Sequence, residues 1–468
     1  MSYKFAIESA KVLATYGIKS YIFESLRPTP ELSFAVRYLK CAGGIMITAS
    51  HNPKEHNGYK VYDDTGCQLL PEAADQVVQY VNEVEDELNI KVFSDEEAYP
   101  YMTWIGEEVD EAYYKEVMAI EVNPGMDKSD FKIVFSPQHG TSNIAVRTCL
   151  TRLGYDLVPV LAQCAPDPDF SNTKSPNPEV PASYELAIKK AKEVDADVVV
   201  ITDPDGDRLG VVAKHNGEYV LMSGNQSAAV YLEYILSQMK EKGTLPDNAV
   251  MYNTIVTSDL GELVARSYGV DVEKTLTGFK FIGDKIRKYE QTHEKTFVFG
   301  YEESYGCVIK DFVRDKDAVQ AVLTAAEAGN FYKKQGKDLV DVLNELYAKH
   351  GTFKETQIAL SKAGAAGAAR IKEIMDNLRK DAPQEIGGVK VVKVEDYGNS
   401  TCSDGTTIQL PKSNVLKYYL EDGSWIAARP SGTEPKCKFY FSIKGSDADD
   451  AASKTEVFHK AMMEIIGE

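Results

Sequence analysis

The sequence has 468 residues, which is too long for one hydrophobic core and predicts roughly three or four domains. Hydrophobic residues make up 43% and charged residues 26%, an ordinary globular mixture that excludes extended disorder. The net charge of -19 argues against a nucleic-acid partner, because a polyanion would be repelled, although a local basic pocket could still bind a small phosphorylated ligand.

Helices and strands alternate along the first 124 residues. Apolar residues recur at helical spacing over residues 3–16, a strand is predicted at 19–23, and further helices are predicted at 31–40 and 71–88. An α/β unit normally opens on a strand that its helix can cover, whereas this chain opens on a helix. The pattern therefore predicts an α/β domain that lacks its first strands.

The alternation of predicted helices and strands restarts twice along the chain. Near His350 it gives way to a different, strand-rich pattern. We predict domains at 1–124, 125–223, 224–350 and 351–468. The middle domains are predicted to contain strands at 132–135, 197–202, 249–255 and 296–300, and helices at 144–153, 183–193, 226–242, 259–268 and 319–335. The last domain is predicted to be α+β, with a helix at 359–378 and strands at 389–394, 405–410, 425–429 and 436–443.

The cysteines and the hydropathy pattern bear on location. The seven cysteines are scattered singly with no C-x-x-C pair, which is typical of a reduced protein. No apolar run approaches the ~20 residues of a membrane span, and the amino terminus lacks the segments of a signal peptide. We therefore expect a cytoplasmic protein with no membrane partner, either a monomer or a dimer.

The first loop of chemical interest is Thr48-Ala-Ser-His-Asn-Pro-Lys-Glu-His-Asn-Gly-Tyr-Lys60. It follows a small and apolar run, so Ser50 is expected at a strand end with its hydroxyl exposed. His51 and Lys60 add a hydrogen-bonding ring and a positive charge, a composition that suits phosphate. On local grounds alone, the favoured interpretation is an ordinary polar loop whose serine caps the next helix.

The second loop, Asp203-Pro-Asp-Gly-Asp-Arg208, places three carboxylates at alternate positions after a predicted buried strand. Mg²⁺ prefers oxygen ligands and is often shared with a substrate phosphate, so Asp203, Asp205 and Asp207 predict a magnesium site. An EF-hand calcium loop would need a longer loop that ends in a ligating Glu, with helices on both sides. Here the chain continues as a predicted strand.

Two further loops are rich in polar groups. Gly300-Tyr-Glu-Glu-Ser-Tyr-Gly306 suits the binding of sugar hydroxyls, although a polar turn is an equally good interpretation, and Thr277-Gly-Phe-Lys280 and Arg314-Asp-Lys-Asp317 add donors nearby. In Arg429-Pro-Ser-Gly-Thr-Glu-Pro-Lys436, the guanidinium, hydroxyls and backbone amides could hold a phosphate dianion. A surface turn is the competing interpretation of this last loop.

In this order, the four loops resemble the phosphoserine, metal-binding, sugar-binding and phosphate-binding loops of the α-D-phosphohexomutase family. The resemblance runs from about residue 3 to the carboxyl end. The loop sequences Thr-Ala-Ser-His-Asn-Pro and Gly-Tyr-Glu-Glu-Ser-Tyr-Gly are most similar to those of the phosphoglucomutase branch. It implies a heart-shaped protein of α/β class, with three α/β mixed-sheet domains and a carboxyl-terminal α+β domain around a central cleft.

The resemblance also implies roles for single residues. Ser50 would carry the phosphoryl group and share Mg²⁺ with Asp203, Asp205 and Asp207. His51 and Lys60 would assist beside the phosphoserine. The implied substrate contacts are Arg208, Thr277, Gly278, Lys280, Glu302, Ser304, Arg429, Ser431, Gly432 and Thr433.

The activity that the resemblance implies is the interconversion of glucose 1-phosphate and glucose 6-phosphate. Phospho-Ser50 would give its phosphoryl group to one end of the hexose phosphate and regain one from the other, through glucose 1,6-bisphosphate. Either Lys60 or Lys316 would exchange a proton with the attacking hydroxyl, and the choice between them stays open.

Family members also carry, before the first helix, a Gly-Thr-Ser-Gly-x-Arg-Gly segment and two strands that this sequence does not contain. Because the Arg of that segment supports the phosphoserine, a catalytically impaired sugar-phosphate-binding paralogue or fragment is a second hypothesis. A phosphomannomutase or a phosphopentomutase would also agree with the resemblance. A metal-dependent phosphatase is less favoured, since it would leave the Ser50 loop and the phosphate clamp without a role.

Overall fold

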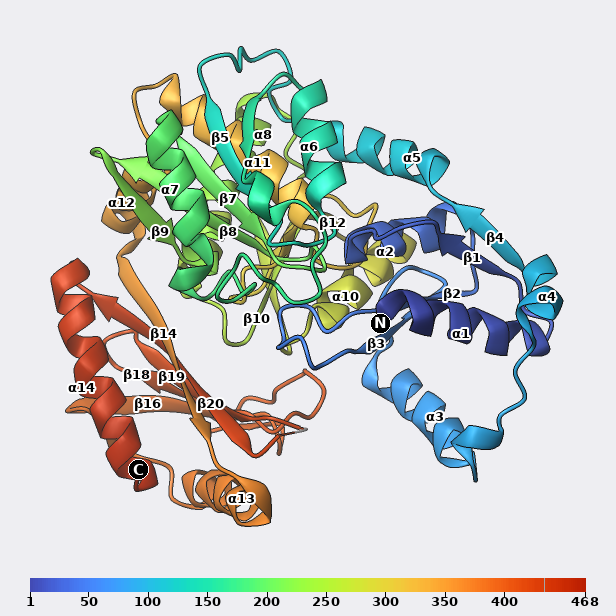
Figure 1. Ribbon diagram of the computed structural model, residues 1–468. Helices are drawn as coiled ribbons and strands as arrows, with labels where there is room; N and C mark the ends of the chain where they lie inside the picture. The colour runs from blue at the N-terminus through green and yellow to red at the C-terminus, as the bar shows by residue number, and fades with distance from the viewer. Residues whose placement is uncertain (433) are drawn as a thin grey trace. The chain divides into compact units, whose positions relative to one another are not determined.

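The computed structural model describes residues 1–432 and 434–468 (Figure 1). It divides into two compact units. The first unit comprises Met1–Asn253, Tyr268–Glu273 and Gly278–Val342, and the second comprises Thr254–Ser267, Lys274–Thr277 and Leu343–Glu468. None of the helices within the described ranges is long and apolar enough to cross a bilayer.

The amino-terminal part of the first unit contains two small sheets rather than one. Its elements are α1 (Ser2–Thr15), β1 (Ser20–Phe23), α2 (Thr29–Tyr38), β2 (Gly43–Ile47), β3 (Tyr59–Asp63), α3 (Pro71–Asn82), α4 (Asp95–Ala98), β4 (Met102–Ile105) and α5 (Glu107–Met118). Strand β1 pairs with β4 in parallel, and β2 pairs with β3 in antiparallel register. Ser50 follows β2 and Lys60 lies on β3, so the β2–β3 pair positions the first loop.

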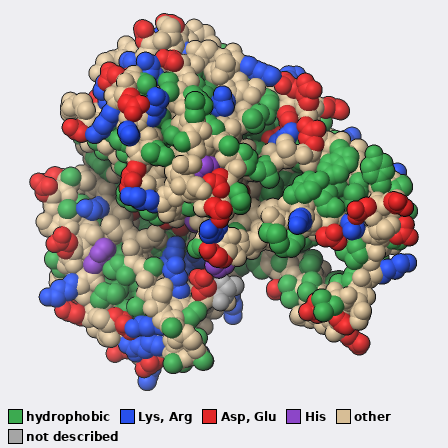
Figure 2. All heavy atoms as spheres, in the orientation of Figure 1, with side chains coloured by type: hydrophobic (Ala, Val, Ile, Leu, Met, Phe, Trp, Pro, Cys, Tyr) green, Lys and Arg blue, Asp and Glu red, His purple; other side chains and the backbone are tan. Residues whose placement is uncertain are grey.

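Within this part, α3 and the β1–β4 pair leave apolar side chains exposed to solvent. Helix α3 buries none of its residues, and its Val81 side chain is 62% exposed. Figure 2 shows hydrophobic side chains gathered over β1 and β4, where Tyr21 and Trp104 are exposed. Apolar contacts therefore stabilise α3 and the β1–β4 pair little, whereas α2 and α5 of the same part bury several residues each.

The second loop joins β7, the central strand of a five-stranded sheet, to β8. The sheet order is β6-β5-β7-β8-β9, formed by β5 (Lys132–Ser136), β6 (Asp156–Pro159), β7 (Val198–Thr202), β8 (Leu209–His215) and β9 (Glu218–Met222), with helices α6 (Asn143–Arg152) and α7 (Glu185–Val194). β7 is buried along its whole length, as its all-apolar centre predicts. The strand ends at Thr202, so the next residue, Asp203, is also buried.

The third loop connects β12 to β13 in a four-stranded sheet of order β11-β10-β12-β13. Its elements are α8 (Gly224–Glu241), β10 (Ala249–Thr254), α9 (Asp259–Ser267), β11 (Asp271–Thr275), α10 (Phe279–Thr292), β12 (Thr296–Tyr301), β13 (Cys307–Val308), α11 (Ala318–Lys333) and α12 (Leu339–His350). α11 is buried at almost every position, and it is rich in Ala, although its buried residues also include the polar Gln320, Glu327 and Asn330. Its buried cap, Asp317, directly follows Lys316 in the sequence.

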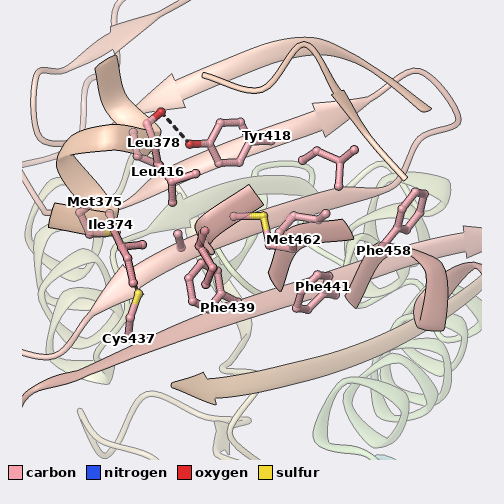
Figure 3. Close-up of a cluster of buried hydrophobic side chains, with 14 of the residues drawn as sticks. Ile374, Met375, Leu378, Leu416, Tyr418, Cys437, Phe439, Phe441, Phe458 and Met462 are labelled. Atoms are coloured by element: carbon pink, nitrogen blue, oxygen red, sulfur yellow. Dashed lines mark hydrogen bonds between the residues drawn. The ribbon is translucent and has the colours of Figure 1, made fainter. Parts of the chain in front are cut away.

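The second unit is built on an antiparallel sheet of order β14-β20-β19-β18-β16-β15, with β17 paired to β16. Its elements are β14 (Thr352–Ser361), α13 (Gly364–Lys380), β15 (Glu385–Ile386), β16 (Val389–Asp396), β17 (Thr401–Cys402), β18 (Leu416–Leu420), β19 (Trp425–Pro430), β20 (Lys436–Gly445) and α14 (Ala448–Ile466). Figure 3 shows its core, in which Met375 of α13 and Met462 of α14 lie with Leu416, Tyr418 and Phe439 of the sheet. The α+β texture of the last segment is confirmed.

Several predicted elements differ from the structure. The predicted strand at 405–410 is wrong, because this stretch makes only an isolated bridge at Thr407. The predicted helix at 359–378 begins at Gly364, since residues up to Ser361 pair with β20 instead. The predicted helix at 71–88 ends at Asn82. Helices α5, α10 and α12 were not predicted.

Candidate active site

Three aspartates follow β7 in one tight, buried turn. Asp203, Asp205 and Asp207 are each at most 2% exposed, and their carboxylate oxygens lie within 4.8 Å of one another. The backbone N–H groups of Asp207 and Arg208 both donate to Asp203 Oδ1 at 3.0 Å, which closes the turn. Gly206 has φ +69°, and a Cβ at this position would lie 2.8 Å from Cβ of Pro28, so the turn favours glycine there.

The carboxylates of this turn are suited to a divalent cation. Oδ1 of Asp205 and Oδ1 of Asp207 are buried and lack a hydrogen-bond partner in the structure. Burial, together with the charges of Asp205 and Asp207, raises the pKa of Asp203 well above its usual value. Three buried carboxylates cannot all ionise without added positive charge, and oxygen ligands of this kind are those that Mg²⁺ prefers.

The Ser50 hydroxyl lies at this carboxylate cluster. Ser50 Oγ donates to Asp203 Oδ2 at 2.8 Å, although the two residues come from different sheets. The Ser50 backbone has φ +54°, a left-handed conformation that is costly for a residue with a Cβ, and its N–H donates to Thr48 Oγ1 at 2.8 Å. Ser50 does not cap a helix, because the described chain continues from this loop into β3. The local interpretation as a helix cap is therefore wrong.

His51 lies on the other side of the same hydroxyl. Its Nδ1 is 3.1 Å from Ser50 Oγ and 4.0 Å from Asp203 Oδ2. Burial and the positive charge of Arg208 lower the pKa of His51 to about 4. The imidazole is therefore neutral at physiological pH and is available as a hydrogen-bonding partner of the serine.

Two lysines neutralise part of the carboxylate charge. Lys60 Nζ lies 3.0 Å from Asp205 Oδ2, and Lys316 Nζ lies 3.1 Å from Asp207 Oδ2. Burial alone would lower their pKa values, but the neighbouring aspartates outweigh it and raise the pKa of both lysines. Lys316 occupies the space beside Gly306, where a Cβ would lie only 2.0 Å from its Cδ.

Arg208 is held by a glutamate that the sequence did not single out. Its Nη1 donates to Glu179 Oε1 at 2.8 Å, and its Nε lies 3.8 Å from Asp207 Oδ1. Glu179 comes from the Pro-rich irregular segment before α7, and no spacing or motif relates it to Arg208. Only the fold brings this pair together.

Two other positioning groups were also missed. Asp315 Oδ2 accepts a hydrogen bond of 2.7 Å from the buried hydroxyl of Tyr62, and its Oδ1 is 3.7 Å from Lys316 Nζ. Asp315 lies within Arg314-Asp-Lys-Asp317, whose mixed charges were the available signal. Tyr62 lies on β3 two residues after Lys60, so alternate residues of this strand serve the same cluster.

The third loop contributes Glu302 to the first unit. Glu302 is 5% exposed, its Oε1 accepts the Gly278 N–H at 2.8 Å, and its Oε2 is 4.0 Å from Lys316 Nζ. Glu302 is thereby linked to the carboxylate cluster through Lys316. Ser304 is half-buried, and Lys280 Nζ lies over the ring of Phe281.

The remaining predicted residues belong to the second unit. The Thr277 hydroxyl is buried without a hydrogen-bond partner in the structure. Arg429 is at the end of β19, with Nη1 3.5 Å from the Tyr440 hydroxyl, and the Ser431 N–H donates to Lys436 O at 2.8 Å. Gly432 has open space beside it, and Thr433 lies outside the described residues.

The first unit thus brings together a hydroxyl, a three-carboxylate turn and two lysines, which lie in or beside the loops that connect its strands and helices. This combination of groups is typical of a metal-assisted phosphoryl-transfer protein, in which a cation and ammonium groups surround a hydroxyl that can accept a phosphoryl group.

Comparison with known families identifies the particular class. Models of the phosphoglucomutase/phosphomannomutase family match the chain in four parts: α/β/α domain I at residues 1–88, domain II at 111–217, domain III at 223–350 and the C-terminal domain at 368–460. The chain belongs to the phosphoglucomutase/phosphomannomutase family, and its resemblance to the α-D-phosphohexomutases is confirmed.

Individual relatives agree with this assignment. A protein named phosphoglucomutase from Staphylococcus epidermidis is 39% identical over 462 residues, covering 97% of this chain and 83% of its own length. One from Staphylococcus aureus is 39% identical over 461 residues, covering 97% of this chain and 82% of its own.

Solved structures share the fold. The open form of the phosphoglucomutase parafusin from Paramecium matches with a TM-score of 0.72 at 19% identity, covering 100% of this chain and 87% of that one. A putative phosphomannomutase from Thermus thermophilus matches with a TM-score of 0.70 at 21% identity, covering 97% and 85%. The expected fold class, α/β with a carboxyl-terminal α+β domain, is confirmed.

Proposed function

We propose that this protein is a phosphoglucomutase that interconverts glucose 1-phosphate and glucose 6-phosphate through phospho-Ser50 and glucose 1,6-bisphosphate. The observation that carries the proposal is the 2.8 Å contact between Ser50 Oγ and Asp203 Oδ2, because it places a hydroxyl directly at the three-carboxylate turn. The names of the Staphylococcus relatives support glucose phosphates as substrates.

In this proposal, Mg²⁺ would be held by Asp203, Asp205, Asp207 and the phosphate on Ser50. Bound there, the ion would neutralise charge on the transferring phosphoryl group. The orphaned oxygens of Asp205 and Asp207 support this assignment, since they are buried polar atoms without another partner in the structure.

Lys60 and Lys316 would contact the phosphoryl group as cations. The neighbouring aspartates outweigh the effect of burial and raise the pKa of each lysine, so each is an ammonium that can donate hydrogen bonds to phosphoryl and sugar oxygens. Either Lys60 or Lys316 would exchange a proton with the attacking hydroxyl. His51, which is neutral, would hydrogen-bond the Ser50 oxygen. Arg208 would help to neutralise the turn.

The other predicted residues would bind the substrate. Glu302 and Ser304 would accept sugar hydroxyls, with Thr277, Gly278 and Lys280 as nearby contacts. Arg429, Ser431, Gly432 and Thr433 would hold the phosphate that is not being transferred. The bisphosphate would turn around between the two half-reactions, so that one phosphate clamp serves both.

A mannose phosphate is the second candidate substrate, because the matching family models describe both phosphoglucomutases and phosphomannomutases. Comparing kcat/KM for glucose 1-phosphate, mannose 1-phosphate and a pentose 1-phosphate would rank these substrates. We further propose a cytoplasmic location, which suits soluble hexose phosphates and the scattered, unpaired cysteines.

A coupled assay tests the proposal. The full chain would be given glucose 1-phosphate, Mg²⁺ and a catalytic amount of glucose 1,6-bisphosphate, and glucose 6-phosphate would be measured with a dehydrogenase. We expect turnover by the wild type and a loss of at least about 10³-fold in Ser50→Ala, the size of effect typical for a missing nucleophile. Substrate binding without any turnover would instead favour a sugar-phosphate-binding protein.

A further inference from the structure

The second unit contains a buried lysine that the proposed reaction does not use. Lys417 lies on β18 between Leu416 and Tyr418, whose side chains enter the core with α13 and α14 (Figure 3). Because side chains alternate along a strand, Lys417 and Tyr419 lie on the opposite face of the sheet. There Lys417 is the register partner of Glu395 on β16 and of Ala427 on β19.

Lys417 has an unusual set of neighbours for a lysine. The residue is 1% exposed, and its Nζ donates to the carbonyl of Ile255 at 2.8 Å. Nζ also lies 3.9 Å from the ring centroid of Trp425 and 4.8 Å from that of Tyr419. Among the described residues, it has no ion pair with a carboxylate. The two rings partly stabilise an ammonium, but a buried ammonium without a counter-ion is costly, so the site shifts the balance toward the neutral amine.

The protonation of Lys417 follows from this environment. Burial and, to a smaller extent, the charge of Lys274 lower the pKa of Lys417 to about 7, against the opposing effects of Asp259, Glu395 and Glu262. At neutral pH about half of the molecules therefore carry the amine with its nitrogen lone pair free. A surface lysine with a pKa near 10.4 has roughly one neutral amine in 2,500 molecules at pH 7.

Lys417 also lies at a cavity of about 200 Å³. Its lining includes the charged Lys274 and Glu395, the apolar Ile408 and Leu410, and Thr407 from an exposed segment. The other two charged lining residues are paired. Lys274 lies 2.9 Å from Glu262, and Glu395 lies 2.9 Å from Lys393. Lys417 is the charged lining residue that lacks an ion pair in the described structure.

We propose that Lys417 is a covalent modification site for small neutral aldehydes, which enter this cavity and condense with its side-chain amine. The Nζ lone pair forms a bond to the carbonyl carbon while the C=O π bond breaks, and a proton then moves from the nitrogen to the oxygen to give a carbinolamine. Loss of the nitrogen proton and of the hydroxyl group as water then leaves a C=N bond. One amine and one aldehyde give one imine and one water, with no change of oxidation state.

The charges around the cavity select the class of reagent. An imine is neutral and relieves the cost of burying an ammonium. An anionic adduct, such as the carbamate formed with carbon dioxide, would face the carboxylates of Glu395, Asp259 and Glu262. For the same reason, an aldehyde that carries a carboxylate should enter poorly. Imine formation also removes the N–H that is donated to Ile255, so the adduct would release the turn that contains this residue.

Reductive labelling of the full chain tests this site. The protein would be treated at pH 7 with limiting acetaldehyde and sodium cyanoborohydride, which traps an imine as an ethylamine, and each lysine would be quantified by peptide mass spectrometry. Lys460, whose side chain is 79% exposed, is the comparator. We expect Lys417 to be labelled at least about tenfold faster than Lys460, because the larger neutral fraction outweighs restricted access.

Two variants and a second reagent sharpen the test. Lys417→Arg keeps a long cationic side chain but should form no adduct at this position. Thr407→Trp fills the cavity from its exposed side and should slow labelling of Lys417 at least about tenfold, with Lys460 unchanged. Glyoxylate, an anionic aldehyde, should show no preference for Lys417. The proposal is overturned if Lys417 is labelled only after unfolding in urea, or if Thr407→Trp is labelled as fast as the wild type.

Discussion

At the level of single residues, the active-site candidate is governed by the burial of charge. Asp203 is fully buried, yet it accepts the Ser50 hydroxyl and two backbone N–H groups, while Asp205 and Asp207 each retain a free oxygen. The raised pKa of Asp203 comes first from burial and then from the charges of Asp205 and Asp207, an excess of buried negative charge that a bound cation would relieve.

This excess predicts specific stabilisation by Mg²⁺. A ligand at a hundred times its Kd stabilises the native state by about 2.7 kcal/mol, so Mg²⁺ should raise the Tm of the wild type. Asp205→Asn removes one ligand charge. The Mg²⁺ concentration that gives half of the rise in Tm should therefore increase at least about tenfold. The measurement is differential scanning fluorimetry over a Mg²⁺ titration.

Asp338→Asn is the matched control for this experiment. Asp338 belongs to the other group of possible ligands, with His215 and Asp341, where the His215 ring is already hydrogen-bonded to the Asp338 carboxylate at 2.8 Å. This variant should respond to Mg²⁺ as the wild type does. An equal loss of response in both variants would contradict the assignment of the cation to the Asp203 turn.

A second prediction at this scale concerns Glu31, which is fully buried at the start of α2. Burial, followed by the nearby Asp110 carboxylate, raises the pKa of Glu31 well above its usual value. The stabilisation linked to its protonated form is present below about pH 4.5 and is lost as pH rises through the raised pKa. Glu31→Gln should therefore raise Tm at pH 8 by several degrees and have little effect at pH 4.

Thermal unfolding of Glu31→Gln and of Glu108→Gln across this pH range provides the measurement. Glu108 is an exposed glutamate on α5, so its replacement should leave Tm unchanged at every pH. If Glu31→Gln were less stable than the wild type at pH 8, Glu31 would be ionised in the native state and the expected sign would be wrong.

At the level of elements, the Asp203 turn is fixed by backbone groups from three other segments. The N–H of Thr29 donates to Asp205 O at 2.8 Å, that of Thr141 to Pro204 O at 2.9 Å, and that of Ala318 to Gly206 O at 3.1 Å. The beginnings of α2 and α11 therefore meet at the turn. These bonds explain how loops from separate sheets bring Ser50 and Lys316 to the same carboxylates.

The cap of α11 is the element on which this arrangement depends most visibly. Asp317 Oδ1 accepts the N–H groups of Val319 and Gln320, and its other oxygen accepts the buried Tyr113 hydroxyl at 2.8 Å. Asp317→Ala should cost the cap, about 1–2 kcal/mol, and a further 1–3 kcal/mol or so for the orphaned Tyr113 hydroxyl. The free energy of unfolding in urea measures this loss.

Asp447→Ala provides the matched control, because Asp447 caps α14 in the same way but is exposed. Its replacement should cost only about 1 kcal/mol. Equal costs for the two variants would show that burial adds nothing at Asp317.

The sequence could predict features that depend on neighbouring residues, but not contacts between residues that are distant along the chain. The all-apolar β7 predicted a buried strand, and the Asp-x-Asp-x-Asp spacing after it predicted a shared ligand site. Each of these signals is local. Glu179, Asp315 and Tyr62 were missed because their partners are distant in sequence or depend on strand pairing. The predicted strand at 405–410 failed because β-propensity did not supply a neighbouring strand to pair with.

At the level of the whole molecule, four family domains are distributed over two compact units. The first unit contains Ser50, the three aspartates, both lysines and Glu302, while the second contains Arg429 and Ser431. The order of the four loops along the chain was therefore the most informative signal in the sequence, since it predicted the family without any knowledge of contacts.

Covalent phosphorylation of Ser50 tests the central claim most directly. The full chain would be incubated with Mg²⁺ and glucose 1,6-bisphosphate, and the intact mass and the Ser50 peptide would be measured for the wild type, Ser50→Ala and the control Ser9→Ala. We predict one phosphoryl group on Ser50 in the wild type and in Ser9→Ala, removed again by glucose 1-phosphate, and none in Ser50→Ala. A folded wild type that takes up no phosphoryl group, or takes it up equally in Ser50→Ala, would contradict the account.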